Sequence, residues 1–287
     1  MRPRSLLFVP ADSERKVARA LSSSADVVIL DLQDGVAAAS KAAARVNARA
    51  VLQASRAGQS PQLWVRINAL STEEAQLDLA ATVPAQPFGL VVPWVEHPEE
   101  LVRLSEQLRL LEEPPTRPSA VARLMALLET ARGILAVPHY LSVALPRLVG
   151  IIFGAEDLAG SLGLQVMRGA DGDWCAPLQS ARAQCLLLAR ALGVDAIDAV
   201  TTQFKDGELL RADCARASAM GFTGKLAIHP DQLDIINAAF TPTAAAVAQA
   251  RRVLAAFEAQ PGVGAITLDG AMIDQVHVRA AQRLLSE

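Results

Sequence analysis

Carboxylates recur in this sequence at the points where short apolar runs end. Asp31 and Asp34 follow the run VVIL. Glu129 follows LMALL, Asp157 follows VGIIFGAE, and Arg66 closes the run LWVR. Oxygen ligands carried by separate segments suit a hard divalent cation such as Mg²⁺, and an arginine beside them suits a substrate carboxylate. This combination predicts metal-assisted chemistry on a 2-oxo acid, in which the cation polarises a carbonyl oxygen while a carbon–carbon bond forms or breaks.

Each of these residues taken alone has a plainer explanation. An Asp at a strand end is commonly a helix N-cap, and Arg66 could form a structural salt bridge. Glu129 is more specific, because a carboxylate at the end of an apolar run is costly to bury unless something binds it. Lys225 is the only lysine near a strand, and it lies toward that strand's beginning, which disfavours a Schiff-base aldolase. His229 is compatible with a capping role.

The elements that must position these residues alternate along the chain. Eight apolar runs of strand length cover residues 5–9, 27–32, 63–67, 89–93, 124–128, 149–154, 195–200 and 224–229. Most are continuously apolar, which is typical of parallel strands buried on both faces. Segments with helical spacing separate them, most clearly at 14–23, 41–55, 98–111 and 176–193. The alternation predicts an α/β protein with a (β/α)₈ TIM barrel over residues 1–240, whose site lies at the carboxyl ends of the strands.

The alternative fold is a doubly wound open sheet. It normally carries a Gly-rich phosphate loop after the first strand, and the VPADSER stretch is not such a loop. Residues 241–287 have no place in an eight-stranded barrel, so they are predicted to form a C-terminal helical extension that contributes to the oligomer and to its active site. A polar loop is expected at 112–120. Trp64, Trp94 and Trp174 are expected to be packing residues.

Composition excludes several classes of function. The chain has 287 residues and a net charge of −3, with Lys and Arg scattered, which argues against nucleic-acid and membrane partners. No apolar run approaches the roughly twenty residues of a membrane span. The N-terminal run is shorter than the about seven to fifteen residues of a secretory signal. The three cysteines lack CxxC spacing, which suits a reducing compartment. We therefore expect a cytoplasmic protein.

Seven stretches of the chain resemble, in the same order, the citrate lyase β-subunit-like (CitE-like) proteins of the HpcH/HpaI aldolase and malyl-CoA lyase superfamily. They are RSLLFVPADSERKVARAL, VVILDLQDGVAAASKAAAR, VRIN, ALLETARG, FGAEDLAGSLG, GFTGKLAIHPDQL and GAMIDQVHVRAA, and they lie between about residues 4 and 285. The resemblance implies a (β/α)₈ barrel that forms a homotrimer or a dimer of trimers. It also implies bound Mg²⁺, with Mn²⁺ as an alternative ion, and a CoA thioester substrate. The implied activity is that of an oxo-acid-lyase, which reversibly cleaves a citryl- or malyl-CoA-like 3-hydroxy acyl-CoA into acetyl-CoA, or a homologue, and a 2-oxo acid.

The resemblance also implies roles for individual residues. Glu129 of LLETARG and Asp157 of GAEDL match the metal ligands. Arg66 of VRIN matches the arginine that holds the carboxylate of the oxo acid. Asp31 and Asp34 match an acidic motif that lines the site, where Asp34 would order a water that acts as a base.

The resemblance implies further roles for Asp274 and for residues expected to contact the substrate. Asp274 of AMID matches an acid that enters the neighbouring subunit's site and acts as acid or base at the thioester α-carbon. Gly154, Ala155 and Glu156, together with Gln33, are expected against the substrate.

Two departures from the family pattern leave alternatives open. The motif DLQD has Gln33 where the family usually has Glu, and Trp94 replaces a lysine that is common in the family. One alternative is a CoA-independent class II pyruvate-type aldolase, which would not need Asp274. The other is a non-catalytic or carrier-dependent subunit of a lyase complex, and the two departures are its only support.

Overall fold

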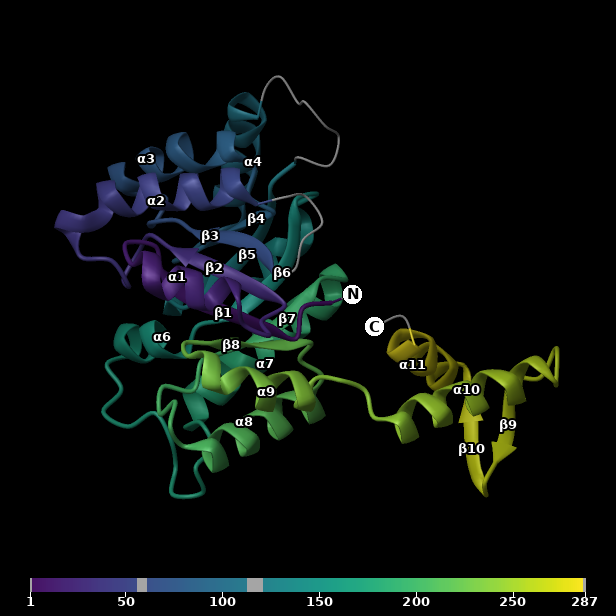
Figure 1. Ribbon diagram of the computed structural model, residues 1–287. Coiled ribbons are helices and arrows are strands. Elements are labelled where there is room, and N and C mark those ends of the chain that lie inside the picture. The colour runs from purple at the N-terminus through teal and green to yellow at the C-terminus, as the bar shows by residue number, and fades with distance from the viewer. Residues whose placement is uncertain (1, 56–60, 113–120, 286–287) are drawn as a thin grey trace.

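The computed structural model describes residues 2–55, 61–112 and 121–285. Its eight main strands form a closed parallel barrel in sequence order, in which β8 pairs with β1 (Figure 1). These strands are β1 (Ser5–Pro10), β2 (Val27–Asp31), β3 (Gln62–Arg66), β4 (Gly89–Val92), β5 (Arg123–Leu128), β6 (Leu148–Phe153), β7 (Asp195–Asp198) and β8 (Gly224–Ala227). The predicted (β/α)₈ fold is confirmed.

Helices cover the outside of the barrel. The α-helices in this part of the chain are α1 (Glu14–Leu21), α2 (Lys41–Ala54), α3 (Glu73–Thr82), α4 (Pro98–Leu111), α5 (Ala131–Leu135), α6 (Ala155–Leu162), α7 (Ala176–Leu192), α8 (Gly207–Met220) and α9 (Leu233–Ala239). Short 3₁₀ turns are η1 (Ala38–Ser40), η2 (Val83–Ala85), η3 (Val137–Ser142) and η4 (Pro230–Gln232). The four helices predicted most clearly correspond to α1, α2, α4 and α7. The polar loop predicted at 112–120 lies, apart from Glu112, outside the described residues.

Two apolar cores explain why the strand runs are continuously apolar. One core lies between the strands and the helices, and the other fills the interior of the barrel, where Trp64 is 1% exposed. Trp174 is also buried, so the packing prediction holds for these two tryptophans. It is wrong for Trp94, whose side chain is 47% exposed because it follows β4 in a turn that has already left the barrel.

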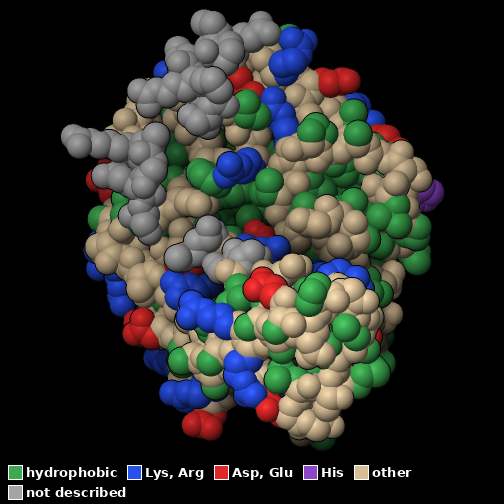
Figure 2. Space-filling model, turned by 90° about the vertical axis from the view of Figure 1, so that its right-hand side faces the viewer, with side chains coloured by type: hydrophobic (Ala, Val, Ile, Leu, Met, Phe, Trp, Pro, Cys, Tyr) green, Lys and Arg blue, Asp and Glu red, His purple; other side chains and the backbone are tan. Residues whose placement is uncertain are grey.

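Residues 244–285 form an extension that packs on itself. It contains α10 (Ala244–Glu258), β9 (Ala265–Leu268), β10 (Ala271–Asp274) and α11 (Gln275–Leu285), which share a small apolar core of their own. The extension projects from the end of the barrel at which β1 begins (Figure 1). Figure 2 views the molecule from this side and shows apolar side chains on the extension and around the hollow beside it. The domain division near residue 240 and the docking on a neighbouring subunit stay predictions.

The β9–β10 hairpin is absent from the prediction of a helical tail. Its two strands pair antiparallel, and the turn between them places Asp269 and Gly270 at φ 51° and 78°. An Asp-Gly pair with two positive φ angles is the usual two-residue hairpin connection. The Asp-Gly pair within the sequence LDGA is therefore the feature from which this hairpin could have been predicted. No helix among the described residues is long and apolar enough to cross a membrane.

Candidate active site

A cavity of about 710 Å³, here called the central cavity, opens at the carboxyl ends of the barrel strands. Eight of the ten residues predicted for the site line it: Asp31, Asp34, Arg66, Glu129, Gly154, Ala155, Glu156 and Asp157. They are far apart in sequence and come together because parallel strands deliver their ends to one side of a barrel. The remaining two, Gln33 and Asp274, are not part of its lining.

Arg66 at the end of β3 is held by Asp31 at the end of β2. Its Nε donates to Asp31 Oδ1 at 2.8 Å and its Nη2 to Oδ2 at 2.7 Å. The two residues are also register partners in the barrel. Burial alone would lower the pKa of Arg66, but the hydrogen bonds and charge of Asp31 outweigh it and raise that pKa. The guanidinium also lies over the ring of Phe8, 4.5 Å from its centroid.

Asp31 is itself held by backbone N–H groups of the loop that follows β2. Its Oδ1 accepts the Gln33 N–H at 2.9 Å and its Oδ2 accepts the Gly35 N–H at 3.0 Å. A Cβ on Gly35 would lie only 2.5 Å from Oδ2, so glycine is required for this close approach. Both carboxylate oxygens of Asp31 are therefore engaged, which makes it a residue that orients Arg66.

Glu129 is 1% exposed at the end of β5. Its Oε1 accepts the backbone N–H of Trp94 at 2.9 Å. Trp94 has φ 53°, a left-handed conformation that is uncommon for a bulky residue and that is found at functional sites. The turn after β4 thus presents an amide, not a side chain, to Glu129.

Asp157 stands at the start of α6, the helix that follows β6. Gly154 is the N-cap residue of this helix and faces Glu129 closely: a Cβ there would lie 2.5 Å from Glu129 Cβ and 2.9 Å from its Oε2. The missing side chain lets β5 and the start of α6 approach, so that the carboxylates of Glu129 and Asp157 lie beside each other.

Burial, and to a smaller extent the neighbouring carboxylates, raises the affinity of three cavity carboxylates for protons. Burial, followed by the charge of Asp157, raises the pKa of Glu129 well above its usual range. Burial also raises the pKa of Asp34, against the opposing charge of Arg66. Burial raises the pKa of Glu156 as well. A divalent cation at this point would offset both the burial of these carboxylates and the repulsion between Glu129 and Asp157.

Two predicted residues lie elsewhere. Gln33 is 6% exposed and its Oε1 has no hydrogen-bond partner among the residues the structure describes. Asp274 ends β10 in the extension, on the far side of the barrel from the central cavity (Figure 1). There its Oδ1 accepts the Val276 N–H at 2.9 Å and lies 2.8 Å from His277 Nδ1. The contact with His277 lowers the pKa of Asp274.

Comparison with known proteins identifies the chain. The family model of the HpcH/HpaI aldolases and citrate lyases matches residues 4–230. The chain belongs to the HpcH/HpaI aldolase/citrate lyase family. It is thus an enzyme of a carbon–carbon lyase family.

Individual relatives match over almost the whole chain. A (3S)-malyl-CoA thioesterase of Cereibacter sphaeroides is 35% identical over 286 residues, which cover 99% of this chain and 94% of the relative. The mitochondrial citramalyl-CoA lyase of Rattus norvegicus is 33% identical over 300 residues, 99% of this chain and 85% of the relative. Among solved structures, CitE of Mycobacterium tuberculosis with magnesium, acetoacetate and coenzyme A has a TM-score of 0.79 and 34% identity, and the match covers 99% and 97% of the two chains. CitE of M. tuberculosis with magnesium and pyruvate has a TM-score of 0.74 and 30% identity, with 98% and 97% of the two chains covered. A citrate lyase β subunit of M. tuberculosis with oxaloacetate and magnesium has a TM-score of 0.68 and 34% identity, with 83% and 96% covered.

The two departures from the family pattern have a local explanation. Gln33 is buried without a partner for its Oε1, so a Glu at this position would bury a charge, which costs more than a neutral amide. Trp94 reaches Glu129 through its backbone, so exchanging the family's lysine for tryptophan leaves that contact in place. Neither departure removes a residue that lines the central cavity.

Several residues around the site were not predicted from the sequence. Lys41 at the start of α2 donates to the carbonyls of Leu32 and Gln33 and, at 2.6 Å, to Asn68 Oδ1, which ties the turn after β2 to the end of β3. Three cations of α1 line the cavity: Arg15, Lys16 and Arg19. Their position directly after the first apolar run was the signal, because every segment that follows a barrel strand starts on this side.

Lys225 and His229 can now be placed. Lys225 is fully buried, and its Nζ pairs with Asp198 at 3.1 Å and donates to the Ala199 carbonyl. It does not line the cavity, so it is not placed to form a Schiff base with a substrate bound there. His229 caps η4, the turn that follows β8, by accepting the Asp231 N–H, and it also lines the cavity.

The donor set fits a magnesium ion more closely than a transition metal. Among the described residues, no group of three or more His, Cys, Asp and Glu side chains is arranged to hold an ion. Mg²⁺ is usually bound by one or two carboxylates, with water and substrate as the other ligands. Glu129 and Asp157 supply such a pair of oxygen ligands at the cavity.

Proposed function

We propose that this protein is a Mg²⁺-dependent lyase that reversibly cleaves a 3-hydroxy acyl-CoA thioester, of the citryl- or malyl-CoA type, into acetyl-CoA or a homologue and a 2-oxo acid. The observation that carries the proposal is the position of Arg66 beside Glu129 and Asp157 in one cavity. A guanidinium has five N–H donors, and Asp31 takes two of them. The Nη1 edge of Arg66 is left for a substrate carboxylate.

Glu129 and Asp157 would hold the magnesium ion. When bound, Mg²⁺ supplies Lewis-acid polarisation of the substrate oxygen that changes between hydroxyl and carbonyl. The Trp94 N–H orients this carboxylate by donating to Glu129 Oε1. Arg66 fixes the orientation of the acid by pairing with its carboxylate, so that the reacting carbon lies beside the ligand pair.

Proton transfer completes the reaction. In cleavage, a water ordered by Asp34 removes the hydroxyl proton, the C–C bond breaks, and its electron pair passes to the α-carbon of the thioester, which then takes up a proton. Asp34 suits this role because its raised pKa brings it nearer to the working pH. Asp274 of a neighbouring copy would give that proton, and in condensation would remove it. His277 lowers the pKa of Asp274, which favours the ionised form needed in condensation.

The α1 side of the cavity suits the phosphates of CoA. Arg15 and Lys16 are exposed, line the cavity, and make no hydrogen bond or ion pair with the described residues. Arg19 adds a third cation, whose ion pair within the described part of the chain is with exposed Asp231 at 3.3 Å. Exposed cations on one side of a mostly apolar cavity suit a ligand with an anionic end and a neutral arm.

A CoA-independent aldolase has one observation in its favour, since Asp274 lies outside its own chain's cavity. A carrier-dependent subunit and a thioesterase are separated from a lyase by their products. All of these alternatives are decided by one assay. The C. sphaeroides relative is named as a thioesterase, so the release of free CoA must be measured beside that of acetyl-CoA.

The experiment offers the purified protein and Mg²⁺ a panel of 3-hydroxy acyl-CoA thioesters, with acetyl-CoA, free CoA and 2-oxo acids read by mass spectrometry. We expect Mg²⁺-dependent acetyl-CoA and oxo acid in equal amounts, and none from Asp157→Ala. The same exchange at exposed Asp234, outside the cavity, should leave turnover unchanged. Free CoA without acetyl-CoA, or aldol cleavage of a CoA-free hydroxy acid alone, would refute the proposal.

A further inference from the structure

A second cavity, of about 600 Å³, is formed by the segments that follow β3 and β4 together with α3 and α4. Segments that follow barrel strands start at the carboxyl ends of the strands, so this cavity lies at the same end of the barrel as the central cavity. The two cavities share no lining residue. The proposed reaction therefore does not account for the second cavity.

Trp94 gives the second cavity an aromatic wall. Its side chain is 47% exposed and stands where the family usually has a lysine, so this wall differs from the family pattern. Its φ of 53° is a strained conformation for a bulky residue, which costs on the order of 1–3 kcal/mol and persists only where the surroundings hold it. Leu70 and Leu104 line the same cavity. The indole and the two leucines offer an apolar surface to a small ligand.

Charges of both signs line the α4 side of the second cavity. Glu96 and Glu100 lie at the start of this side, and Arg103 lies one turn further along α4. Glu100 Oε1 accepts the His97 N–H at 3.0 Å, and Glu96 pairs with exposed Arg132 at 3.3 Å. Arg103 is exposed and forms no hydrogen bond or ion pair within the described part of the chain. The cavity thus has acids at one end and an available guanidinium one helical turn away.

The two kinds of charge suit a ligand that carries both. Burial raises the pKa of Glu100, although backbone N–H groups and the charge of Arg103 favour its ionised form. A positively charged ligand group beside this carboxylate would stabilise the ionised form. Side chains three positions apart on a helix have Cβ atoms about 5–6 Å apart, a distance that one small molecule spans. A zwitterion therefore matches this side of the cavity better than a simple anion or cation.

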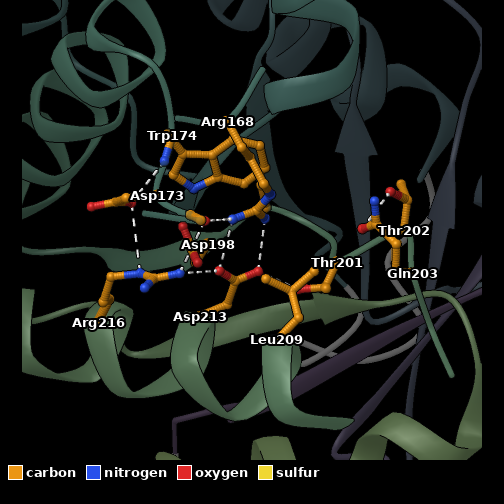
Figure 3. A network of polar contacts seen from close by, with 12 residues as sticks. Arg168, Asp173, Trp174, Asp198, Thr201, Thr202, Gln203, Leu209, Asp213 and Arg216 are labelled. Carbon is orange, nitrogen blue, oxygen red and sulfur yellow. Dashed lines mark hydrogen bonds and ion pairs between the residues drawn. The ribbon is translucent and has the colours of Figure 1, made fainter. Parts of the chain in front are cut away.

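Figure 3 shows how a comparable set of groups is completed elsewhere in the chain. Arg168 lies over the Trp174 ring, 3.9 Å from its centroid, and donates to both oxygens of Asp213 at 3.0 and 2.8 Å. There the indole, the guanidinium and the carboxylate all come from the protein. The second cavity has Trp94 and Arg103, but no described carboxylate hydrogen-bonds to that arginine. A ligand carboxylate would fill this place.

Two amides limit the length of the ligand. Gln107, one turn beyond Arg103 on α4, donates from its Nε2 to Oε1 of Gln76 on α3, and both glutamines line the cavity. This bond joins the two helices and bounds the cavity beyond Arg103. A free α-amino acid meets these limits, because it carries both charges on one carbon and leaves a single side chain for the apolar surface.

The turn that carries Trp94 connects the second cavity to Glu129. The Trp94 N–H donates to Glu129 Oε1 at 2.9 Å. A Cβ on Gly133, at the start of α5, would lie 2.5 Å from the Val95 carbonyl oxygen, so the turn packs directly against the helix that follows Glu129. A ligand that contacts the Trp94 side chain therefore acts on the residue that orients Glu129.

We propose that the second cavity is an effector site that binds a free α-amino acid with an apolar or aromatic side chain. The ammonium group would lie beside Glu100, the carboxylate would pair with Arg103, and the side chain would lie against Trp94. Occupancy would hold the Trp94 turn in the conformation that orients Glu129, and so raise the affinity for Mg²⁺. The inference rests on the proposed function only in taking Glu129 as a metal ligand, and it does not depend on which thioester is cleaved.

The test uses L-phenylalanine and L-leucine as probes, with acrylamide quenching of tryptophan fluorescence as the readout. Trp64 and Trp174 are 1% and 4% exposed, so quenching reports mainly on Trp94. We expect the amino acids to protect Trp94, and 2-phenylethylamine and 3-phenylpropionate, which each lack one charge, to bind at least about tenfold more weakly. Arg103→Gln should abolish the protection and leave kcat/KM without amino acid unchanged. Arg49→Gln, at an exposed arginine of α2 outside both cavities, should keep the protection.

Titration with and without Mg²⁺ tests the coupling. Because linkage is reciprocal, the amino acid should bind at least about fivefold more tightly with Mg²⁺, and calorimetry should show Mg²⁺ binding more tightly by the same factor when the amino acid is present. The proposal is overturned if neither amino acid protects Trp94, if the truncated analogues bind equally well, if protection survives Arg103→Gln, or if Mg²⁺ leaves the affinity unchanged. A protein that shows the coupling but cleaves no thioester would refute the proposed lyase and not the effector site.

Discussion

Gly154→Ala tests whether the close approach of α6 to β5 positions Glu129. The added Cβ would lie 2.5 Å from Glu129 Cβ, 2.9 Å from its Oε2 and 3.1 Å from Leu127 Cδ1. Carbon atoms in contact are normally about 3.5–4.0 Å apart, so the Glu129 side chain must withdraw by about 1 Å. Overpacking of this kind costs about 1–3 kcal/mol of unfolding free energy. A ~1 Å misplacement of a reacting group costs on the order of 100-fold in rate, so we expect kcat/KM to fall by about that factor.

Gly160→Ala is the matched control. Gly160 lies in the same helix, and a Cβ there has nothing within 4 Å. In a helix interior, alanine is more favourable than glycine by about 0.5–1 kcal/mol, so this variant should be slightly more stable and fully active. The assays are Mg²⁺ titration by calorimetry, thermal unfolding, and kcat/KM on the best thioester. The reasoning is refuted if Gly154→Ala folds and keeps both Mg²⁺ affinity and kcat/KM within about twofold of the parent.

Three further predictions concern pH, the carboxylate clamp and the buried lysine. Burial raises the pKa of Glu129, so the folded state favours its protonated form; the associated stability is present below the ordinary carboxyl pKa and is lost as pH rises through the raised one. Without Mg²⁺, Tm should therefore fall with rising pH and be restored by Mg²⁺, and Glu129→Gln should flatten the profile in thermal scans. Arg66→Lys keeps the positive charge but loses the planar guanidinium that can pair with a carboxylate through two hydrogen bonds. We therefore expect at least about 100-fold lower kcat/KM with a modest change in Tm. Parental kinetics would contradict the pairing of Arg66 with the substrate carboxylate. Lys225→Met removes one of the two cations that pair with Asp198 and leaves Arg182 in place, so it should cost about 1–3 kcal/mol in urea unfolding. Borohydride should trap no adduct on the parent, and an adduct would revive the Schiff-base alternative.

The barrel could be predicted from the sequence because each strand is buried on both faces and therefore appears as an uninterrupted apolar run. The residues of the central cavity could be predicted for a related reason. Asp31, Arg66 and Glu129 each follow such a run, and a parallel barrel brings all such ends to one side. No knowledge of the intervening helices was needed.

Features that depend on how a helix or turn is placed could not be predicted in this way. The position of α1 directly after β1 places the start of this helix at the cavity end of the barrel, but which of its side chains line the cavity depends on the orientation of the helix. The Trp94 turn adopts a left-handed φ without a glycine, so its sequence carries no sign of it. The β9–β10 hairpin has strands of only four residues, too short for periodicity, and only Asp269-Gly270 marks it.

The role of Asp274 across a subunit boundary can be tested by mixing two inactive variants. Asp274→Ala lacks the residue offered to a neighbour, and Glu129→Gln lacks the metal ligand of its own cavity. In a ring of randomly mixed copies, a site is intact when its own chain has Glu129 and its neighbour has Asp274, which is about a quarter of the sites. Co-expressed variants should therefore regain about a quarter of the parental activity, whereas each variant alone stays inactive. If Asp274 served the cavity of its own chain, no mixed assembly would contain an intact site. Recovery thus requires the exchange, and it agrees with an extension that packs on itself at the opposite end of the barrel from its own cavity.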